Sequence, residues 1–596
     1  MSRELFSQST PIDAFSSLEM DSRKHDGFVA LGHDIHHLIL TELVETSRSS
    51  LLALAQVSHL LYGITTPYVY CNLVLARGVV AQRPRGAENE HLTLDGRQPS
   101  LQTKPRRAYY NLLDRIRQDT GDKIVKHVRH IRVEDTIPSE ELLVVLGKVQ
   151  NLRQFSWHAN QTISQLVLDK LQTTWPKLKL FVRRSRRHHA EEGHRSIDFP
   201  LLSSPQLDTL ACTVYIKDNV PQAELTQSEW PQLTRAIVAG AHCRILRLRL
   251  RKDQYFYNEP KVLKGTEEHA VPRFSDTSTM RLPPLEEIQI LTGRFYTRYP
   301  WDMSHCLQLR NCMDCSRIRV LDFSRDYPRA FFSAFTGELP NLQSLCFGLP
   351  GPYGQQDESV QDVVRFLDSC IGLKALDISR LASRADEMWP AVLRHKDTLE
   401  ELVLRPTIGY WITPGSGRPE YLDTRYLQQI TEEFPRLERL GFDVPFCDPQ
   451  IGVRKSKKPK KDSPQVDPAY LALLTTLRLR RLDLFLYLPT AATPFAAGLD
   501  QNATGTIPHP ELNAKALQSY AMDLADRISA AQKRPLQTLT MHLARTGFED
   551  RAQPYLMEGE FQIRRSERDD AEMMGEAKWT VEGKCSWDHF LDDETN

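Results

Sequence analysis

Three histidines near the N-terminus have spacing that could bind a metal ion. His33, His36 and His37 can share one face of a helix, as the histidine ligands of some zinc sites do. No cysteine or carboxylate at a suitable spacing completes a ligand set around them. We therefore interpret them as solvent-facing side chains of a helix that has another role.

A second group combines one histidine with three cysteines, His305, Cys306, Cys312 and Cys315, and includes a C-x-x-C motif. A structural zinc site needs a second pair of ligands at similar spacing, and the chain shows no partner C-x-x-C or H-x-H. Cys315 also directly precedes a strand-like phrase. These side chains are therefore expected to pack within a folded repeat.

Motifs for catalysis or phosphate binding were also sought. Gly583-Lys584 resembles the end of a phosphate-binding loop, but Lys578 occupies the position where that loop needs glycine. The chain has neither a G-x-S-x-G elbow nor a dinucleotide fingerprint. The sequence therefore predicts no catalytic residue, no cofactor and no metal, and we expect the chain not to be an enzyme.

The composition limits the partners and the cellular compartments that can be expected for the chain. The 596 residues carry 76 Lys+Arg and 76 Asp+Glu, so no net charge favours nucleic acid or an anionic membrane as a partner. The sequence shows no signal-peptide pattern and no apolar run that could span a bilayer. The ten scattered cysteines are typical of reduced thiols. We expect a cytoplasmic or nuclear protein.

Two basic clusters lie in predicted loops, at 183–189 and 455–461. The second is a candidate nuclear import signal or weak phosphate contact. Basic clusters in loops are more often simply solvated, so neither assigns a partner.

A short phrase recurs along most of the chain: apolar, two residues, apolar, one residue, apolar. Its twelve copies begin at Val128, Leu152, Leu207, Cys243, Leu285, Ile318, Leu342, Leu373, Leu399, Leu437, Leu479 and Leu536, and a degenerate copy begins at Leu178. The alternation at its end predicts a short strand with its apolar residues on one face.

Helix-like runs alternate with these phrases, at 140–149, 164–175, 359–370, 423–434 and 514–531, and a further one covers 109–125. Near the C-terminus, 560–565 and 578–582 can pair as a hairpin that closes the sheet edge.

The repeating strand–helix unit resembles a leucine-rich repeat. That resemblance implies an α/β fold, a curved solenoid with a parallel sheet. The spacing of the phrases runs from about 24 to about 57 residues, so the array is irregular. Its main insertions are expected at 252–284, 407–422, 447–468 and 488–510. The alternative is a non-repetitive α/β domain that is rich in leucine.

Residues 28–75 are predicted to form short amphipathic helices. Apolar side chains recur at helical spacing from Ile35 to Leu43 and again from Leu51 to Leu61, and Thr66-Pro67 is expected to open a third element. Helices this short need packing against each other or against a partner. The alternative is an ordinary helical hairpin that caps a larger domain.

This stretch resembles a fungal F-box, the adaptor-binding motif of modular ubiquitin ligases. The resemblance rests on Leu31, Ile35, Leu38, Ile39, Leu43, Leu51, Leu54, Val57, Ser58, Leu61-Tyr62 and 66–70. It departs from the family in having Gly32 after Leu31, where proline is usual, and in lacking a late tryptophan.

The resemblance implies a substrate-recognition subunit of a cullin-RING ligase of the SCF type. Its F-box would bind the small adaptor protein, and through it the cullin, while the repeats hold a protein substrate. The candidates for the adaptor contact, or for the core directly beneath it, are Leu31, Ile35, Leu38, Ile39, Leu51 and Leu54. The expected substrate contacts are polar residues that project from the strands onto the concave face: Arg132, Arg247, Asp322, Asp377 and Asp483. Because the basic ones come early and the acidic ones late, this surface is expected to be polarised.

The predicted organisation has five parts: a leader at 1–27, the F-box-like unit at 28–75, a linker and helix at 76–126, the solenoid at 127–545, and a C-terminal cap with an acidic tail at 546–596. Two other functions stay open. One is a repeat scaffold for protein interactions unrelated to ubiquitin ligases, which the F-box departures favour. The other is an enzyme built on the array, which would need a convergent polar pocket.

Overall fold

The computed structural model describes residues 33–46, 48–76, 103–118, 124–134, 137–159, 162–183, 198–216, 229–252, 281–292, 303–324, 326–350, 359–405, 421–444, 446–447, 465–466, 468–488, 522, 524–528, 536–547, 555–565 and 579–584. The chain divides into two compact units, Met1–Ala81 with Arg97–Arg183 and Gln82–Gly96 with Arg184–Asn596. Across these described ranges, every helix is too short or too polar to cross a bilayer.

The first unit begins with helices and continues as alternating strands and helices. Its elements are α2 (His33–Thr46), α3 (Arg48–Ala55), α4 (His59–Val69), β1 (Asn72–Leu75), α5 (Thr103–Gln118), a 3₁₀ turn (Val125–His127), β2 (His130–Val133), α6 (Ser139–Lys148), β3 (Gln154–Trp157), α7 (Gln165–Thr174) and β4 (Lys179–Arg183). Strands β1 to β4 pair in parallel and in chain order. The F-box-like stretch therefore also supplies β1, the first strand of this sheet.

The second unit repeats the same alternation over a longer length. Its elements up to β10 are α8 (Phe199–Leu202), β5 (Leu207–Ile216), α9 (Glu229–Gly240), β6 (Ile245–Lys252), β7 (Glu287–Thr292), α10 (Met303–Cys312), β8 (Val320–Asp322), α11 (Arg329–Phe335), β9 (Ser344–Gly348), α12 (Gln361–Ser369) and β10 (Ala375–Ser379). Those that follow are α13 (Ala385–Leu393), β11 (Glu401–Arg405), α14 (Thr424–Glu433), β12 (Arg439–Val444), β13 (Phe446–Cys447), β14 (Gln465–Val466), α15 (Pro468–Leu474), β15 (Arg481–Leu488), β16 (Thr538–Gly547), β17 (Tyr555–Arg565) and β18 (Trp579–Lys584).

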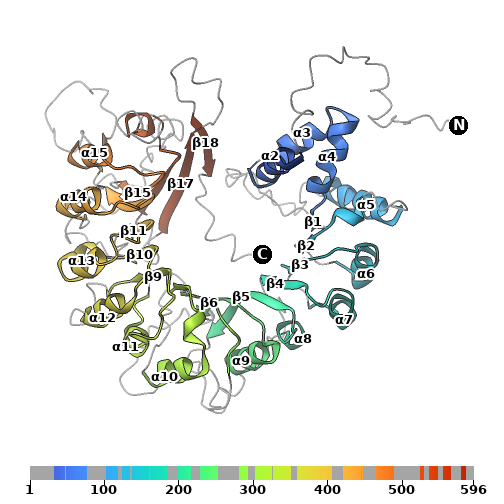
Figure 1. Ribbon diagram of the computed structural model, residues 1–596, viewed down its shortest axis with the longest axis horizontal. Coiled ribbons are helices and arrows are strands. Elements are labelled where there is room, and N and C mark those ends of the chain that lie inside the picture. The colour runs from blue at the N-terminus through green and yellow to red at the C-terminus, as the bar shows by residue number, and fades with distance from the viewer. Residues whose placement is uncertain are drawn as a thin grey trace, which may run out of the picture. The chain divides into compact units, whose positions relative to one another are not determined.

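The strands of the second unit form one sheet in chain order, β5 to β12 and then β15 to β18. All neighbours are parallel until β16, and then β17 and β18 are antiparallel. The predicted C-terminal hairpin is thus confirmed, and its last strand lies at the edge of the sheet. Strands β13 and β14 pair separately. In each unit the helices lie along one face of the strands (Figure 1).

The recurring phrase forms a strand at every predicted copy, which confirms an α/β fold with a parallel strand–helix repeat. In the twelve regular copies the first, fourth and sixth residues are buried against the helices. Neighbouring strands align at the third position, as in Ser344↔Ala375↔Glu401. The copy at Leu178 is one residue shorter, because Leu180 aligns with Phe155, the fourth residue of its neighbour.

Aromatic side chains fill the space between strands and helices around β8 and β9. Phe323, Phe331, Phe332, Phe347 and Phe366 are each at most 1% exposed, and Phe332 contacts Phe323, Phe347 and Phe366 edge-on or tilted. Burial of such side chains contributes the main free energy that holds one repeat to the next.

Most predicted helices are present within two residues of their expected ends; they are α6, α7, α12 and α14. The run at 109–125 is wrong in its bounds, since α5 covers Thr103–Gln118 and a 3₁₀ turn follows at Val125–His127. The run at 514–531 lies largely outside the described residues, as do the basic cluster at 455–461 and most of each predicted insertion.

The third N-terminal helix does not open at Thr66-Pro67 as predicted. The second helix ends at Ala55, and α4 starts at His59, where the Ser58 hydroxyl accepts a hydrogen bond from the Leu61 amide at 3.2 Å. Pro67 lies inside the last turn of α4. The correction has a local cause, because a serine N-cap satisfies free amides at a helix start.

Candidate functional site

The N-terminal helices α2, α3 and α4 enclose a small core of their own. Leu40, Leu51 and Val69 are buried together, and five partly buried side chains pack against them: Leu43, Leu54, Ile64, Tyr68 and Tyr70. His37 Nδ1 and Tyr68 Oη form a hydrogen bond of 2.6 Å between α2 and α4. The three helices are therefore held in a defined mutual arrangement.

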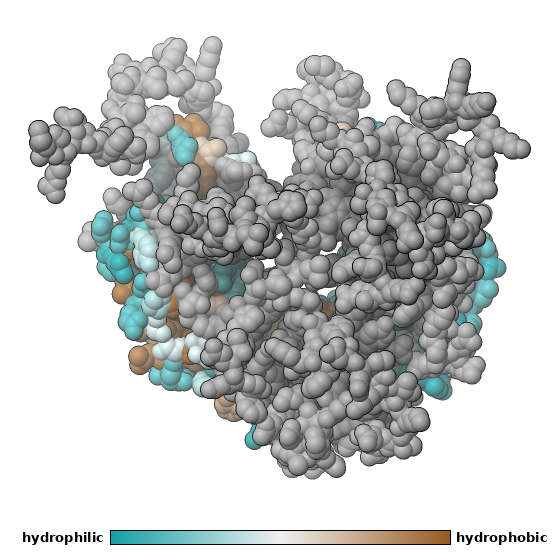
Figure 2. Space-filling view, turned by 180° about the vertical axis from the view of Figure 1, so that it is seen from behind, coloured by the Kyte–Doolittle hydropathy of each residue, from teal (hydrophilic) through white to brown (hydrophobic). Residues whose placement is uncertain are grey.

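The same helices expose an unusual amount of apolar surface. Among the residues whose side chains the structure describes, eleven large apolar ones are exposed, and six of them fall between Ile35 and Tyr62. These six, which we call the apolar surface, are Ile35, Leu38, Leu52, Val57, Leu60 and Tyr62. Brown and pale atoms gather over this helical region (Figure 2, upper left). Concentrated exposed apolar surface marks an interaction site.

The predicted adaptor contacts divide between this surface and the core beneath it. Ile35 is 46% and Leu38 68% exposed, whereas Leu51 is 1% exposed. Ile39 and Leu54 are partly buried. Leu31 lies outside the described residues. Leu51 thus belongs to the core beneath the surface, one of the two places expected for it, whereas sequence reasoning omitted the exposed Leu52 and Leu60.

Helix α2 buries a different face from the one that the spacing indicated. The buried positions are His36 and Leu40, with Leu43 packed against the core, so the inward stripe follows i, i+4 and i+7. The prediction that the histidines face solvent is wrong for His36, which is 7% exposed. Both faces of this helix are apolar in sequence, so periodicity alone could not select the inner one.

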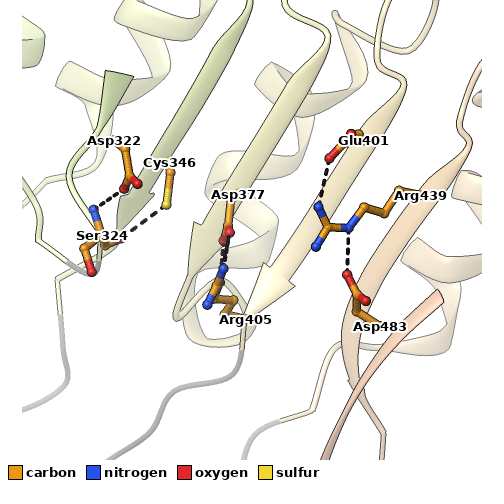
Figure 3. Close-up of polar contacts among 8 residues, drawn as sticks. All are labelled: Asp322, Ser324, Cys346, Asp377, Glu401, Arg405, Arg439 and Asp483. Carbon is orange, nitrogen blue, oxygen red and sulfur yellow. Dashed lines mark hydrogen bonds and ion pairs between the residues drawn. The ribbon is translucent and has the colours of Figure 1, made fainter. Parts of the chain in front are cut away.

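The second candidate site lies on the sheet of the second unit. We call the face opposite the helices the polar face; it presents the third, fifth and seventh residues of each phrase. Figure 3 shows eight of the residues over β8 to β15, with their polar contacts drawn. Charged side chains of opposite sign meet here across neighbouring strands.

Asp377 is held by an arginine from the next strand. Arg405 Nε lies 2.9 Å from both carboxylate oxygens of Asp377, and Arg405 Nη2 lies 2.7 Å from Oδ2 (Figure 3). Burial works against the charge of Arg405, but the charge and hydrogen bonds of Asp377 outweigh it and keep the pKa of Arg405 above its usual value. Asp377 is therefore already paired.

A second arginine bridges two carboxylates farther along. Arg439 Nε lies 2.7 Å from Asp483 Oδ2, and Arg439 Nη1 lies 3.0 Å from Glu401 Oε2 (Figure 3). Gly441 makes room beside this bridge. A Cβ atom there would lie 2.9 Å from Val403 Cγ1 and 3.3 Å from Asp483 Cβ.

Asp322 stands apart from these ion pairs. Its Oδ1 accepts a 2.7 Å hydrogen bond from the backbone amide of Ser324. Ser324 has a positive φ of 56°. The neighbouring Cys346 donates to the Ser324 carbonyl with Sγ and O 3.6 Å apart (Figure 3). Burial raises the pKa of Asp322, and the Ser324 amide offsets part of that rise. Burial and two nearby carboxylates also raise the pKa of the Cys346 thiol, so this thiol is unreactive.

The expectation that five polar strand residues project freely from the sheet needs correction. Arg132 and Arg247 are exposed, with Glu134 at 2.9 Å and Glu287 at 2.7 Å as their partners. Asp322 and Asp377 are partly buried, and Asp483 is only 5% exposed. The expected acidic end is thus largely neutralised, because Arg405 and Arg439 lie across Asp377 and Asp483. The proposed substrate role of these residues stays a prediction.

Sequence reasoning missed Glu401, Arg405 and Arg439, although they form ion pairs on the polar face. They occupy the third and seventh positions of their phrases, on the same face as the fifth position that was considered. Opposite charges at these positions of successive phrases are the signal that could have found them.

The other residues that the sequence offered as metal or phosphate ligands lie within regular helices, turns and strands. His305 and Cys306 are buried on α10, Cys312 ends that helix and Cys315 begins a 3₁₀ turn. Within the described ranges, nowhere do three or more potential ligands cluster to hold a metal ion. Gly583-Lys584 ends β18.

Comparison of the chain with models of known protein families finds no match, and comparison with curated proteins finds no significant similarity.

Proposed function

We propose that the chain is a substrate-recognition subunit of an SCF-type cullin-RING ubiquitin ligase. The apolar surface on α2, α3 and α4 binds the small adaptor protein, and the polar face of the second unit binds a protein substrate. The isopeptide chemistry then belongs to other subunits. This chain contributes proximity by holding the substrate near the activated carrier.

One observation supports this proposal above the others. Three short helices pack around Leu40 and Leu51, yet leave six large apolar side chains in water within 28 residues, Ile35 to Tyr62. Exposing such side chains brings no gain to an isolated cap, whereas burying them against a partner contributes roughly 25 cal/mol per Å² of apolar area. The F-box resemblance of the same helices favours the adaptor as that partner.

The polar face suits the substrate role for a different reason. Its side chains come from many successive strands, so they form an extended surface with a fixed arrangement of charges. Rigid strands hold Arg405 and Arg439 in place through two hydrogen-bonded contacts each. Such a surface discriminates between partners by complementary charge more than it contributes raw affinity.

The test is co-purification of the full chain with the adaptor. In the double variant Leu38→Asp, Leu52→Asp, both changes lie in exposed positions of the apolar surface, so the helices stay folded and binding falls by more than about a hundredfold. Val144→Asp is the matched control, because Val144 is 39% exposed on α6 of the same unit. Leu51 is unsuitable as a contact variant, since it is a core residue.

Retention of adaptor binding by the folded double variant would contradict the proposal. Failure of the folded wild-type chain to bind the adaptor would also contradict it, and would favour a repeat scaffold that uses the same apolar surface for another protein.

A further inference from the structure

The second residue of each recurring phrase lies at or just before the start of a strand, and in the second unit these residues pair by charge. Arg244 Nε lies 2.8 Å from Asp208 Oδ1, and Arg244 Nη1 lies 3.3 Å from Glu286 Oε2. Later phrases hold two more such pairs, Lys374 with Glu400 at 3.3 Å and Arg480 with Glu438 at 3.5 Å. Opposite charges on neighbouring strands therefore stabilise one another at this position.

The first unit has two arginines at the same position and lacks the carboxylates. Arg129 and Arg153 directly precede β2 and β3, which pair in parallel. The backbone amide of Arg153 donates to the Arg129 carbonyl at 2.7 Å, so the two residues are neighbours across the sheet. Among the described residues, no carboxylate forms an ion pair with either arginine. Like charges therefore lie side by side here, which costs stability unless an anion binds.

The turn before β2 adds a third cation and holds one of the arginines in place. Lys126 belongs to this turn, and its side chain is exposed, as is that of Arg153. Arg129 Nη1 donates to the Lys126 carbonyl at 2.8 Å, and an arginine has four further N–H donors for a ligand. Asn151 Nδ2, two residues before Arg153, lies 3.5 Å from the same carbonyl oxygen. We call Lys126, Arg129 and Arg153 the basic cluster.

The charge of the basic cluster acts on two histidines beside it. Burial lowers the pKa of His127, and the charges of Lys126 and Arg129 lower it further. Burial also lowers the pKa of His130, and the charge of Arg153 adds to the effect. No described carboxylate opposes either shift. The positive charge of the cluster is therefore not neutralised within the described chain.

We propose that the basic cluster binds an acidic segment of a partner protein, rich in aspartate or glutamate. The carboxylates of that segment take the role that Asp208 and Glu286 have beside Arg244 in the second unit. The guanidinium groups of the cluster suit carboxylates because they donate two parallel hydrogen bonds, and its ammonium group adds a point charge. The inference goes beyond the proposed function and does not depend on the ligase assignment, because it concerns the sheet of the first unit.

An acidic peptide fits the basic cluster better than a nucleic acid does. Domains that bind nucleic acid are typically strongly basic, whereas this chain has 76 Lys+Arg and 76 Asp+Glu. Three cations also neutralise fewer phosphates than the roughly six to ten that a DNA-binding protein contacts. A short run of carboxylates matches the size of the cluster.

The inference is tested with the full chain and a fluorescein-labelled octapeptide that alternates glycine with four glutamates. The matched peptide has glutamine in place of each glutamate. Fluorescence anisotropy at low salt should show tighter binding of the glutamate peptide, and this binding should weaken as salt is added. In the double variant Arg129→Gln, Arg153→Gln, binding should fall about tenfold or more, because two charge-assisted contacts are lost.

Two single variants sharpen the result. Arg153→Gln changes an exposed side chain, so the fold is kept, and it should weaken binding about threefold or more. Arg319→Gln is the matched control. Arg319 is exposed at the same position of its phrase, but its neighbour at this position is Glu286, whose carbonyl accepts from the Arg319 amide at 2.8 Å. This variant should bind the peptide as the wild-type chain does.

Equal binding of the two peptides by the wild-type chain would overturn the inference, and so would full binding by the folded double variant. Tighter binding of a single-stranded oligonucleotide of the same charge would also overturn it and would favour a nucleic acid. Adaptor co-purification, measured on the same variants, should be unaffected, so failure here is distinguishable from failure of the proposed function.

Discussion

The apolar surface of α2, α3 and α4 and the polar face of the second unit differ in how many of their side chains already have partners within the described chain. The helices leave Leu38 and Leu52 in water with nothing from the described chain to cover them. The polar face pairs most of its charges internally, as Arg405 does with Asp377. Burying an apolar surface against a partner protein lowers the free energy, whereas exchanging one partner of a paired charge for another changes the free energy little.

This difference indicates where affinity and where selectivity reside. We expect the helices to bind strongly and with little dependence on salt, since their contacts are apolar. The polar face should bind weakly and with strong dependence on salt. Asp322 differs from Asp377 and Asp483 on that face, since Arg405 acts on it only from beyond ion-pair distance.

The largest expected effect of a substitution comes from breaking an internal pair of the polar face. Asp377→Ala leaves Arg405, whose side chain is 39% exposed, without its bidentate partner, and we expect a loss of up to about 3 kcal/mol in the free energy of unfolding. Urea denaturation measures it. The double variant Asp377→Ala, Arg405→Met should recover most of the loss, because no unpaired charge is left. A single variant as stable as the wild type would show that the pair contributes nothing.

A pH effect of similar size is expected from Asp443, on the same face of β12. Burial raises its pKa to about 7, and its Oδ2 has no partner. The folded state therefore binds a proton that the unfolded state releases near pH 4. Stability should fall as pH rises from about 4 to about 7, by on the order of 4 kcal/mol.

Asp443→Asn should remove this part of the pH dependence, because the amide does not titrate. Thermal unfolding at several pH values checks both chains. Parallel curves for wild type and variant would contradict the assignment.

A smaller effect is expected where the polar face is most crowded. Gly441→Ala places a Cβ atom 2.9 Å from Val403 Cγ1, and such overpacking costs about 1–3 kcal/mol. Val403→Ala in the same chain removes the clashing methyl groups and should recover part of the loss. Urea midpoints of the wild-type chain and the two variants provide the measurement.

The smallest effect is expected at the exposed pair of Arg247 and Glu287. Their contact of 2.7 Å involves an arginine side chain that is 45% exposed, so Arg247→Gln should cost less than about 1 kcal/mol. A loss as large as that of Asp377→Ala would remove the contrast between a pair with a single contact and the bidentate pair of Asp377 and Arg405.

The strands were predictable because each phrase carries its own pattern. Three apolar positions recur within six residues, and each copy needs only its neighbours to bury them, as Leu345 and Leu376 show. The pairing of Arg405 with Asp377, 28 residues apart, was not predictable in this way. Their positions in successive phrases place both residues on the polar face of neighbouring strands, but the side-chain conformations decide which of the charges there meet.

The N-terminal helices show the same limit on a smaller scale. Sequence spacing located α2, but it left open whether Leu51 belongs to the contact surface or to the core, and it left out Leu52. Both are leucines, and the packing against Leu40 decides which one faces inward. Amphipathic spacing cannot separate an inner apolar face from an outer one that is kept for a partner.

The most direct test of the account is titration calorimetry of the full chain with the purified adaptor at several temperatures. We predict binding with a negative heat-capacity change, the mark of buried apolar area, that is lost in the Leu38→Asp, Leu52→Asp variant and kept in Val144→Asp. Absence of heat at every temperature, or the same binding in all three chains, would contradict the assignment of these helices as an adaptor-binding site.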